Sequence, residues 1–182
     1  MFRRIAVILG VGVLLLSWAV ATSASPNQKK GPLPAKKQLA LAKAATTKYR
    51  DVGRAEADGY HAPAGPDGKP VCVASPMGGM GIHYENQALM ANNALHVQRP
   101  EILVYAPQPD GSLKLVALEY FKADNDQDTT TNSDLPRMFR RAFDGPMDGH
   151  APGMPVHYDL HVWLYQANAS GMFAMFNPSV SC

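Results

Sequence analysis

Cysteine is scarce in this chain of 182 residues, and neither sign of charge is in clear excess. Only 2 cysteines are present, too few for a small domain held together by many disulfides. The 46% of hydrophobic residues argues against a disordered or collagen-like chain. With 17 basic and 15 acidic residues, and no basic face interleaved with aromatic residues, nucleic acid is not expected as a partner.

Patterns that mark common enzyme classes are also missing from the sequence. It has no Gly-x-Ser-x-Gly elbow, no glycine-rich phosphate loop and no His-Glu-x-x-His pair. Serine hydrolase, nucleotide-binding and zinc-protease functions therefore lack their usual signals.

Only one long apolar run occurs, over residues 5–20, and it follows Arg3 and Arg4 and leads into small residues. This order is typical of a secretory signal peptide, predicted here for residues 1–24. The run is shorter than the about 20 apolar residues that a membrane span needs, so no span is expected after processing. We expect a secreted or periplasmic protein.

Residues 25–35 are rich in proline, glycine and lysine and predict a flexible leader. A single α+β domain is expected over residues 36–182. Its first element is an amphipathic helix over residues 36–58, indicated by apolar and small side chains at three-to-four-residue spacing.

The later part of the chain predicts strands. β-Branched and aromatic residues are frequent in residues 81–85, 101–106, 112–121 and 156–165. A Pro-Asp-Gly turn joins the second and third of these stretches into an antiparallel hairpin. The expected fold class is α+β, with the N-terminal amphipathic helix packed on a curved, mostly antiparallel sheet, as in cystatin-like or nuclear transport factor 2-like folds.

Cys72 and Cys182 are an even pair in a chain expected to be exported, which predicts a structural disulfide. Closing a loop of about a hundred residues contributes about 4 to 5 kcal/mol in the chain-entropy model. A blue-copper site built on cysteine, methionine and histidine is less well supported, because Cys182 has no histidine beside it.

A short internal repeat places methionine and histidine in equivalent positions. The sequence GMGIHY, which contains Met80 and His83, is matched by GMPVHY, which contains Met154 and His157. Thioether and imidazole groups together are ligands that suit copper. The alternative is that the methionines fill a core and the histidines form hydrogen bonds at strand ends.

His157 and His161 lie in a stretch where apolar residues alternate with other types, a period of two that predicts a strand. At about 3.3 Å per residue the two histidines are then about 13 Å apart, too far to bind one ion. At most one of them is expected in a mononuclear site. The strand face that carries them is predicted either to line a pocket or to face solvent or a partner.

Glu119 lies in an apolar run over residues 115–121 that predicts a central strand. A carboxylate there needs a partner, because burying a lone charge is very costly. The candidate partners are a metal ion, a histidine, Arg137, Arg140 and Arg141. A metal site of His83, Glu119 and either His157 or His161 would resemble two-histidine, one-carboxylate sites, which leave positions open for water or substrate.

Asp124, Asp126 and Asp128 have the one-three-five spacing of an EF-hand calcium loop. The stretch departs from that pattern at Thr129, where glycine is needed, and at Leu135, where glutamate is needed. The prediction here is a solvated acidic loop.

A set of specific motifs is spread over residues 45–182. These motifs are KYRD (48–51), ADGY (57–60), GGMGIHY (78–84), PEILVY (100–105), HVW (161–163), GMF (171–173), NP (177–178) and Cys182. Together they resemble a family of secreted bacterial hypothetical proteins of unassigned function. The resemblance implies a single intact domain, and no functional residue or mechanism follows from it.

The first functional hypothesis is a secreted or periplasmic metal-binding protein, with copper preferred over other divalent metals. Its candidate ligands are His83, Glu119, His157, His161, Met80 and Met154. A second hypothesis is a module that binds haem or a small apolar ligand, with Trp163, Tyr165, Tyr84 and the methionines as pocket walls and His83 as anchor or axial ligand. A structural envelope protein without catalytic activity is the third.

Overall fold

The computed structural model of the protein describes residues 32–182, of which Leu33–Cys182 form one compact unit. The predicted signal peptide and most of the predicted leader lie outside the described residues. The helices are α1 (Ala35–Thr46), the short 3-10 helix η1 (Thr47–Arg50), α2 (Val52–Ala57) and α3 (Gln87–Asn92). The strands are β1 (Cys72–Ser75), β2 (Gly78–Glu85), β3 (Ile102–Pro107), β4 (Leu113–Ala123), β5 (Arg137–Met138), β6 (Arg141–Ala142), β7 (Asp144–Met147) and β8 (His157–Val162).

The N-terminal helix is not continuous, contrary to the prediction for residues 36–58. The chain leaves the helical conformation at Asp51, whose backbone is extended, and α2 begins at the next residue. The Asp51 carboxylate accepts a hydrogen bond of 2.9 Å from the backbone N–H of Gly53 and so caps α2. Aspartate favours such caps because its side chain competes with the helical backbone for hydrogen bonds.

A curled antiparallel sheet of six strands forms the centre of the protein, in the order β1-β2-β3-β4-β8-β7. The predicted hairpin is confirmed as β3 and β4, which pair from Ile102 opposite Glu119 to Pro107 opposite Leu113. Strands β5 and β6 form a separate two-stranded sheet. Strands β1, β5, β6 and β7 and helix α3 are not predicted from the sequence, because elements of two to six residues are too short to display a clear period.

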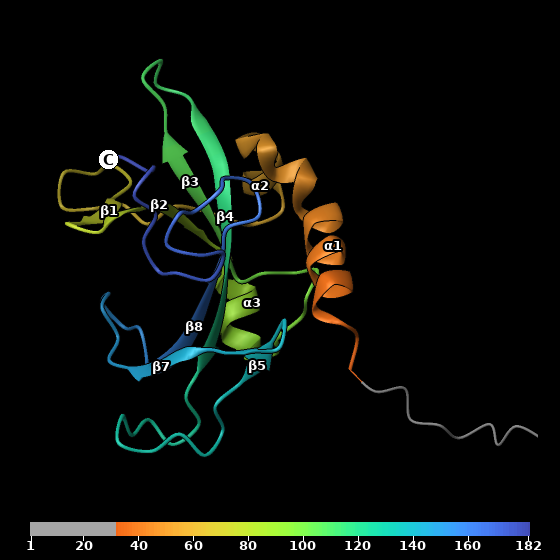
Figure 1. Ribbon diagram of the computed structural model, residues 1–182. Helices are drawn as coiled ribbons and strands as arrows, with labels where there is room; N and C mark the ends of the chain where they lie inside the picture. Colours follow the sequence, from red (N-terminus) through yellow and green to blue (C-terminus); the bar gives the residue numbers. More distant parts are fainter. Residues whose placement is uncertain (1–31) are drawn as a thin grey trace, which may run out of the picture. The chain divides into compact units, whose positions relative to one another are not determined.

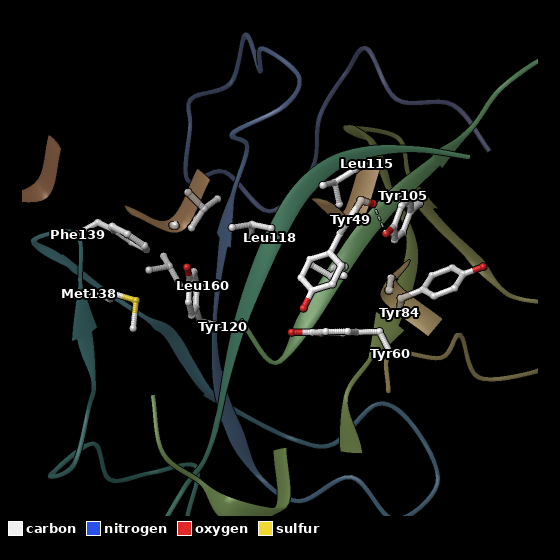
Figure 2. Close-up of a cluster of buried hydrophobic side chains, with 14 of the residues drawn as sticks. Tyr49, Tyr60, Tyr84, Tyr105, Leu115, Leu118, Tyr120, Met138, Phe139 and Leu160 are labelled. Atoms are coloured by element: carbon white, nitrogen blue, oxygen red, sulfur yellow. Dashed lines mark hydrogen bonds between the residues drawn. The ribbon is translucent and has the colours of Figure 1, made fainter. Parts of the chain in front are cut away.

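The two faces of the sheet are covered differently, and Figure 1 shows α1 and α2 on one side of the strands. On this side, helix residues such as Ala42 and Tyr49 pack with alternate strand residues into one apolar cluster. Tyrosines are prominent among the members of this cluster, as Figure 2 shows. Their buried hydroxyl groups are satisfied, since Tyr105 donates to the backbone oxygen of Tyr49 at 2.6 Å and Tyr120 to that of Val97 at 2.7 Å.

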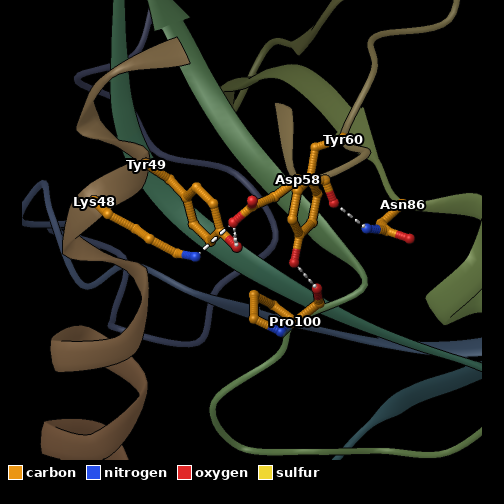
Figure 3. Close-up of polar contacts among 6 residues, drawn as sticks. All are labelled: Lys48, Tyr49, Asp58, Tyr60, Asn86 and Pro100. Carbon is orange, nitrogen blue, oxygen red and sulfur yellow. Dashed lines mark hydrogen bonds and ion pairs between the residues drawn. The ribbon is translucent and has the colours of Figure 1, made fainter. Parts of the chain in front are cut away.

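Polar contacts hold the helices against the strands (Figure 3). The carboxylate of Asp58 accepts a hydrogen bond of 2.9 Å from the hydroxyl of Tyr49 and pairs with Lys48. The backbone oxygen of Asp58 accepts a bond of 3.0 Å from the side chain of Asn86. Tyr60 donates to the backbone oxygen of Pro100 at 2.8 Å. The KYRD and ADGY motifs thus have a structural role at the junction of helix and sheet.

The opposite face of the sheet is partly covered by the C-terminal segment. Trp163 and Val180 pack there with apolar residues of β3 and β4. The close approach requires glycine at position 79, because a Cβ atom there would lie 2.8 Å from the side chain and backbone of Val180. The predicted disulfide is confirmed, and it joins Cys72 in β1 to Cys182 across 110 residues.

These features confirm the α+β class and the helix packed on a curled antiparallel sheet. Within residues 32–182, no helix combines the length and the apolar character needed to cross a membrane.

Candidate metal centre

Three side chains from three strands meet on the sheet face opposite the helices. They are His83 on β2, Glu119 on β4 and His161 on β8. Glu119 lies directly opposite His161 in the β4–β8 pairing. Alternation along each strand separates them from the helix-side core, which contains the neighbouring residues Tyr84 and Leu118.

His83 reaches Glu119 across an intervening strand. Neighbouring strands are about 4.8 Å apart, so β2 and β4 are separated by about twice that distance. The residues between them on this face are small, since His83 is opposite Val104 and Val104 is opposite Ala117. Short side chains and the curl of the sheet leave room for the imidazole and the carboxylate to approach each other above β3.

The spacing of the donor atoms fits one small cation. The Nε2 atom of His83 is 3.1 Å from Oε2 of Glu119, and the Nε2 atom of His161 is 3.3 Å from the same oxygen. The ligand atoms of the three residues all lie within 4.8 Å of one another. Two ligands bound about 2.1 Å from a metal at tetrahedral or octahedral angles lie about 3.0 to 3.4 Å apart. Both measured contacts fall in that range.

The site is buried, and its polar atoms lack ordinary partners. The exposed fraction of the side chain is 1% for His161, 6% for Glu119 and 17% for His83. Neither ring nitrogen of His161 nor Oε2 of Glu119 has a hydrogen bond of acceptable geometry. Buried polar groups are nearly always hydrogen-bonded, so this concentration of unpaired atoms needs a ligand or another explanation. A cation bound between the three residues would satisfy Oε2 of Glu119 and Nε2 of His161.

Electrostatics keep Glu119 ionised. Burial favours the neutral acid, but positive charge on the neighbouring histidines, His161 or His83, outweighs it and lowers the pKa of Glu119. Burial also disfavours the charged form of His83, but the negative charge of Glu119 prevails and raises the pKa of His83. An ionised carboxylate is the form that binds metal.

His161 is held in a different state from His83. Burial is the main reason that the pKa of His161 is lowered, so the neutral imidazole is favoured. Its Nδ1 atom is 3.9 Å from the carboxylate of Asp159. Burial and the nearby charge of Glu119 raise the pKa of Asp159 to about 8. The two groups are neighbours without a hydrogen bond, and the raised pKa favours the protonated acid of Asp159 at neutral pH.

His157 belongs to the same strand face but not to the group. Its Nδ1 atom forms a 3.0 Å hydrogen bond with the backbone oxygen of Pro155, and its ring stacks on Phe121. It lies opposite Ala123 in the β4–β8 pairing, four positions from the His161–Glu119 pair. The expectation that at most one of these histidines joins a mononuclear site agrees with this arrangement, since of the two only His161 belongs to the group that could hold an ion.

The two candidate methionines lie on β2 and in the loop before β8. Met80 has no partner opposite it in β1, because the β1–β2 register shifts between Gly79 and Gly81. Met154 lies in the loop before β8. Met154 also lines a cavity that lies beside the group of His83, Glu119 and His161. Both methionines stay predicted ligands.

Glu119 pairs with histidines, and the predicted alternative of an arginine partner is wrong. Arg137, Arg140 and Arg141 are exposed, whereas Glu119 is buried against His83 and His161. The short strands β5 and β6 carry two of these arginines outside the six-stranded sheet.

The aromatic residues proposed as walls of one ligand pocket have separate roles. Tyr84 is in the helix-side core, because it follows His83 on a strand and therefore points to the other face. The indole N–H of Trp163 donates to the backbone oxygen of Ala174 at 2.6 Å. The hydroxyl of Tyr165 bonds with Thr46 of α1 at 2.8 Å.

A cavity of about 420 Å³ lies beside the three-residue group, and the sequence analysis did not identify it. Glu85 and Phe121 line it, and each is two positions along its strand from a member of the group, His83 or Glu119. Residues 151–155 form another wall. A small molecule in this cavity would be next to a bound metal ion.

Comparisons of the chain with family models, curated proteins and solved structures give no match.

Proposed function

We propose that this protein is exported and binds one divalent transition-metal ion, with copper(II) preferred, at His83, Glu119 and His161. The unpaired buried Oε2 atom of Glu119 and Nε2 atom of His161 carry the proposal, because a cation at their common centre would remove the cost of burying them. The 3.1 and 3.3 Å contacts to Oε2 of Glu119 match the separation of ligands around one ion.

The preference for copper rests on the donor set and on the expected compartment. Two imidazoles and a carboxylate suit copper, zinc and iron, and divalent copper binds such sites most tightly in the usual affinity order. The Cys72–Cys182 disulfide supports an oxidising compartment, where copper persists as copper(II). The resemblance of its motifs to those of secreted bacterial proteins is a further reason to propose export.

Three protein ligands leave coordination positions unfilled. Such open positions are the usual feature of metal sites that bind water or a substrate, whereas purely structural sites are closed by four protein ligands. His83 is the most exposed member of the group, and the neighbouring cavity begins at Glu85 on the same strand. The metal site is therefore expected to be accessible to small molecules.

Metal analysis of protein purified without a histidine tag tests the proposal. We expect one copper ion per chain after loading, with electron paramagnetic resonance showing two nitrogen ligands, and weaker binding of zinc and iron(II). The variants His83→Asn, His161→Asn and Glu119→Gln should each lose stoichiometric binding, as should the double replacement of His83 and His161 by Ala.

His157→Asn is the matched control, because His157 is on the same strand and face as His161 but outside the group. It should bind copper as the wild type does. Retention of one tightly bound ion by the His83 and His161 variants would reject the ligand assignment. Absence of metal uptake by the wild type, or a Soret absorption band in its place, would reject the metal function itself.

A further inference from the structure

The cavity of about 420 Å³ beside the metal centre has the size of a small-molecule site, since such sites occupy about 300 to 1,000 Å³. Its walls are α3 with the cap residue Asn93, residues of β2 and β4, and the loop over residues 151–155. The largest apolar side chains that line it are Met90, Phe121 and Met154. A molecule bound among them needs an apolar body.

The wall that α3 provides is fixed to β4. Gln87, Met90 and Ala91 all line the cavity, and their spacing of three and four residues places them on one face of the helix. At the end of α3 the side chain of Asn93 donates to the backbone oxygen of Ala123 at 3.2 Å and accepts from its backbone N–H at 2.8 Å. These two bonds hold the helix beside the strand.

The loop over residues 151–155 is held at its end by hydrogen bonds of the next residue, Val156. Its backbone oxygen accepts a bond of 2.9 Å from the backbone N–H of Asp124, and its own N–H donates to the side chain of Gln127 at 2.9 Å. The prediction of a solvated acidic loop is wrong for Asp124, which is 3% exposed at this junction. The cavity therefore lies between anchored walls, and a preformed site binds with less loss of entropy.

Glu85 is the one ionisable residue among the described residues that line the cavity. Its Oε2 atom accepts a hydrogen bond of 2.6 Å from the side chain of Gln87, whereas its Oε1 atom accepts none from residues 32–182. Within the same residues it forms no ion pair with lysine, arginine or histidine. The carboxylate is half-buried and keeps free acceptor positions, so it can bind a positively charged donor.

The two amide side chains of the cavity offer less to a ligand. Both polar atoms of the Asn93 side chain are bonded to the backbone of Ala123, and the amide N–H of Gln87 is directed to Glu85. Glu85 is therefore the main polar contact that a ligand can make, and an anionic ligand would face an uncompensated negative charge.

We propose that this cavity binds a small organic amine, with its ammonium group at Glu85 and its apolar body against Met90 and Phe121. Residues two apart on a strand are about 7 Å apart, which is the separation of Glu85 from the metal ligand His83 on β2. The position of the amine beside a metal ion rests on the proposed function, whereas the cavity and its carboxylate do not.

Three probes of similar size and different charge test the proposal on the metal-free protein. They are phenethylamine, the neutral phenethyl alcohol and the anionic hydrocinnamate, and binding is followed by nuclear magnetic resonance chemical-shift titration. We expect the amine to bind about tenfold more tightly than the alcohol, because charge-assisted hydrogen bonds are the stronger ones. Hydrocinnamate should bind least.

Glu85→Gln keeps the shape of the side chain and removes its charge. In this variant the advantage of phenethylamine over phenethyl alcohol should disappear. Glu56→Gln is the matched control, because it removes the same charge from an exposed position on α2 that does not line the cavity. It should bind all three probes as the wild type does.

A second pair of variants tests the location. Ala91 and Ala88 are both exposed on α3, but Ala91 lines this cavity, whereas Ala88 lines a second one of about 450 Å³ that shares Glu85. Ala91→Phe should fill the first cavity and abolish binding of phenethylamine. Ala88→Phe should leave binding unchanged. These two variants also decide the matter if Glu85→Gln fails to fold.

Copper(II) tests the placement beside the metal. Because the ion is paramagnetic, loading the protein should broaden the proton signals of bound phenethylamine, and Ala91→Phe should remove the broadening. Binding of the amine without broadening in copper-loaded protein would overturn the placement beside the metal ion and leave the amine site standing. The two failures are thereby distinguished.

Other results would overturn the amine site itself. These are no binding of phenethylamine by the wild type, equal binding of the three probes, and equal effects of Glu85→Gln and Glu56→Gln. Loss of binding in Ala88→Phe but not in Ala91→Phe would assign the amine to the second cavity and reject the site proposed here.

Discussion

Glu119 on β4 lies directly opposite His161 on β8, and its Oε2 atom is 3.3 Å from the Nε2 atom of that histidine. Cross-strand neighbours are the closest side-chain pairs that an antiparallel sheet offers. The pair therefore depends on the β4–β8 register, and a shift of one residue would turn one partner to the other face. His83 completes the group from β2.

The charge of Glu119 should control the protonation of His83. Glu119→Gln removes the negative charge that raises the pKa of His83, so the opposing effect of burial should prevail and the pKa should fall. Nuclear magnetic resonance titration of the imidazole in metal-free protein measures this change. Glu85→Gln is the control, since Glu85 has a smaller influence on the same histidine. An equal effect of both variants would contradict the pairing.

Glu101 should make the protein less stable as the pH rises. Burial raises the pKa of this glutamate from 4.5 to about 8, so the folded state holds a proton that the unfolded state has released. Its stabilising contribution is complete below pH 4.5 and is lost as the pH rises through about 8, with a slope of about 1.4 kcal/mol per pH unit for one proton.

Glu101→Gln should remove this contribution to the slope. The amide can still accept the hydrogen bond of 3.1 Å from the backbone N–H of Phe121. Urea unfolding at several pH values between 5 and 9 gives the free energies, and the difference between variant and wild type should grow in favour of the variant as the pH rises. Parallel curves for the two proteins would show that Glu101 does not titrate in this way.

Removing the disulfide should cost much of the stability of the domain. The Cys72–Cys182 bond spans 110 residues, and a loop of that size contributes about 4 to 5 kcal/mol by restricting the unfolded chain. Replacing both cysteines with serine should lower the free energy of unfolding by about that amount in urea titrations. A loss below about 1 kcal/mol would mean that the unfolded chain is little restricted by the bond.

Gly81 should be essential for the position of His83, two residues further along β2. Its φ angle is +113°, and a Cβ atom there would lie 2.5 Å from the backbone oxygen of Tyr105 on β3. Gly81→Ala should therefore lower the free energy of unfolding by about 1 to 3 kcal/mol and weaken copper binding. Gly111→Ala is the control, since its φ is also positive but no atom lies within 4 Å of the added methyl group. Equal losses in both variants would contradict a clash with β3.

Part of the fold could be predicted, because the spacing of apolar and turn residues along the sequence indicates individual strands and turns. The strict alternation before Trp163 predicts the strand that became β8, and the Pro-Asp-Gly turn predicts the hairpin of β3 and β4. The apolar run around Glu119 correctly indicates a central strand and a carboxylate in need of a partner. The sequence does not reveal the break of the first helix at Asp51, because the spacing of apolar residues continues across the break. The break depends on the cap that the single side chain of Asp51 provides for α2.

Only the tertiary structure decides which of the candidate ligands come together. Local alternation places His157 and His161 on one face and leaves them equivalent, whereas the pairing register puts His161 opposite Glu119 and His157 opposite Ala123. The partner His83 comes from a strand beyond β3, and its approach depends on the curl of the sheet. The burial of Asp124 likewise follows from the packing of its loop at the end of β4. A sequence pattern determines which side of a strand a residue occupies, but distances between strands arise only when register and curvature are set by the packing of the whole sheet.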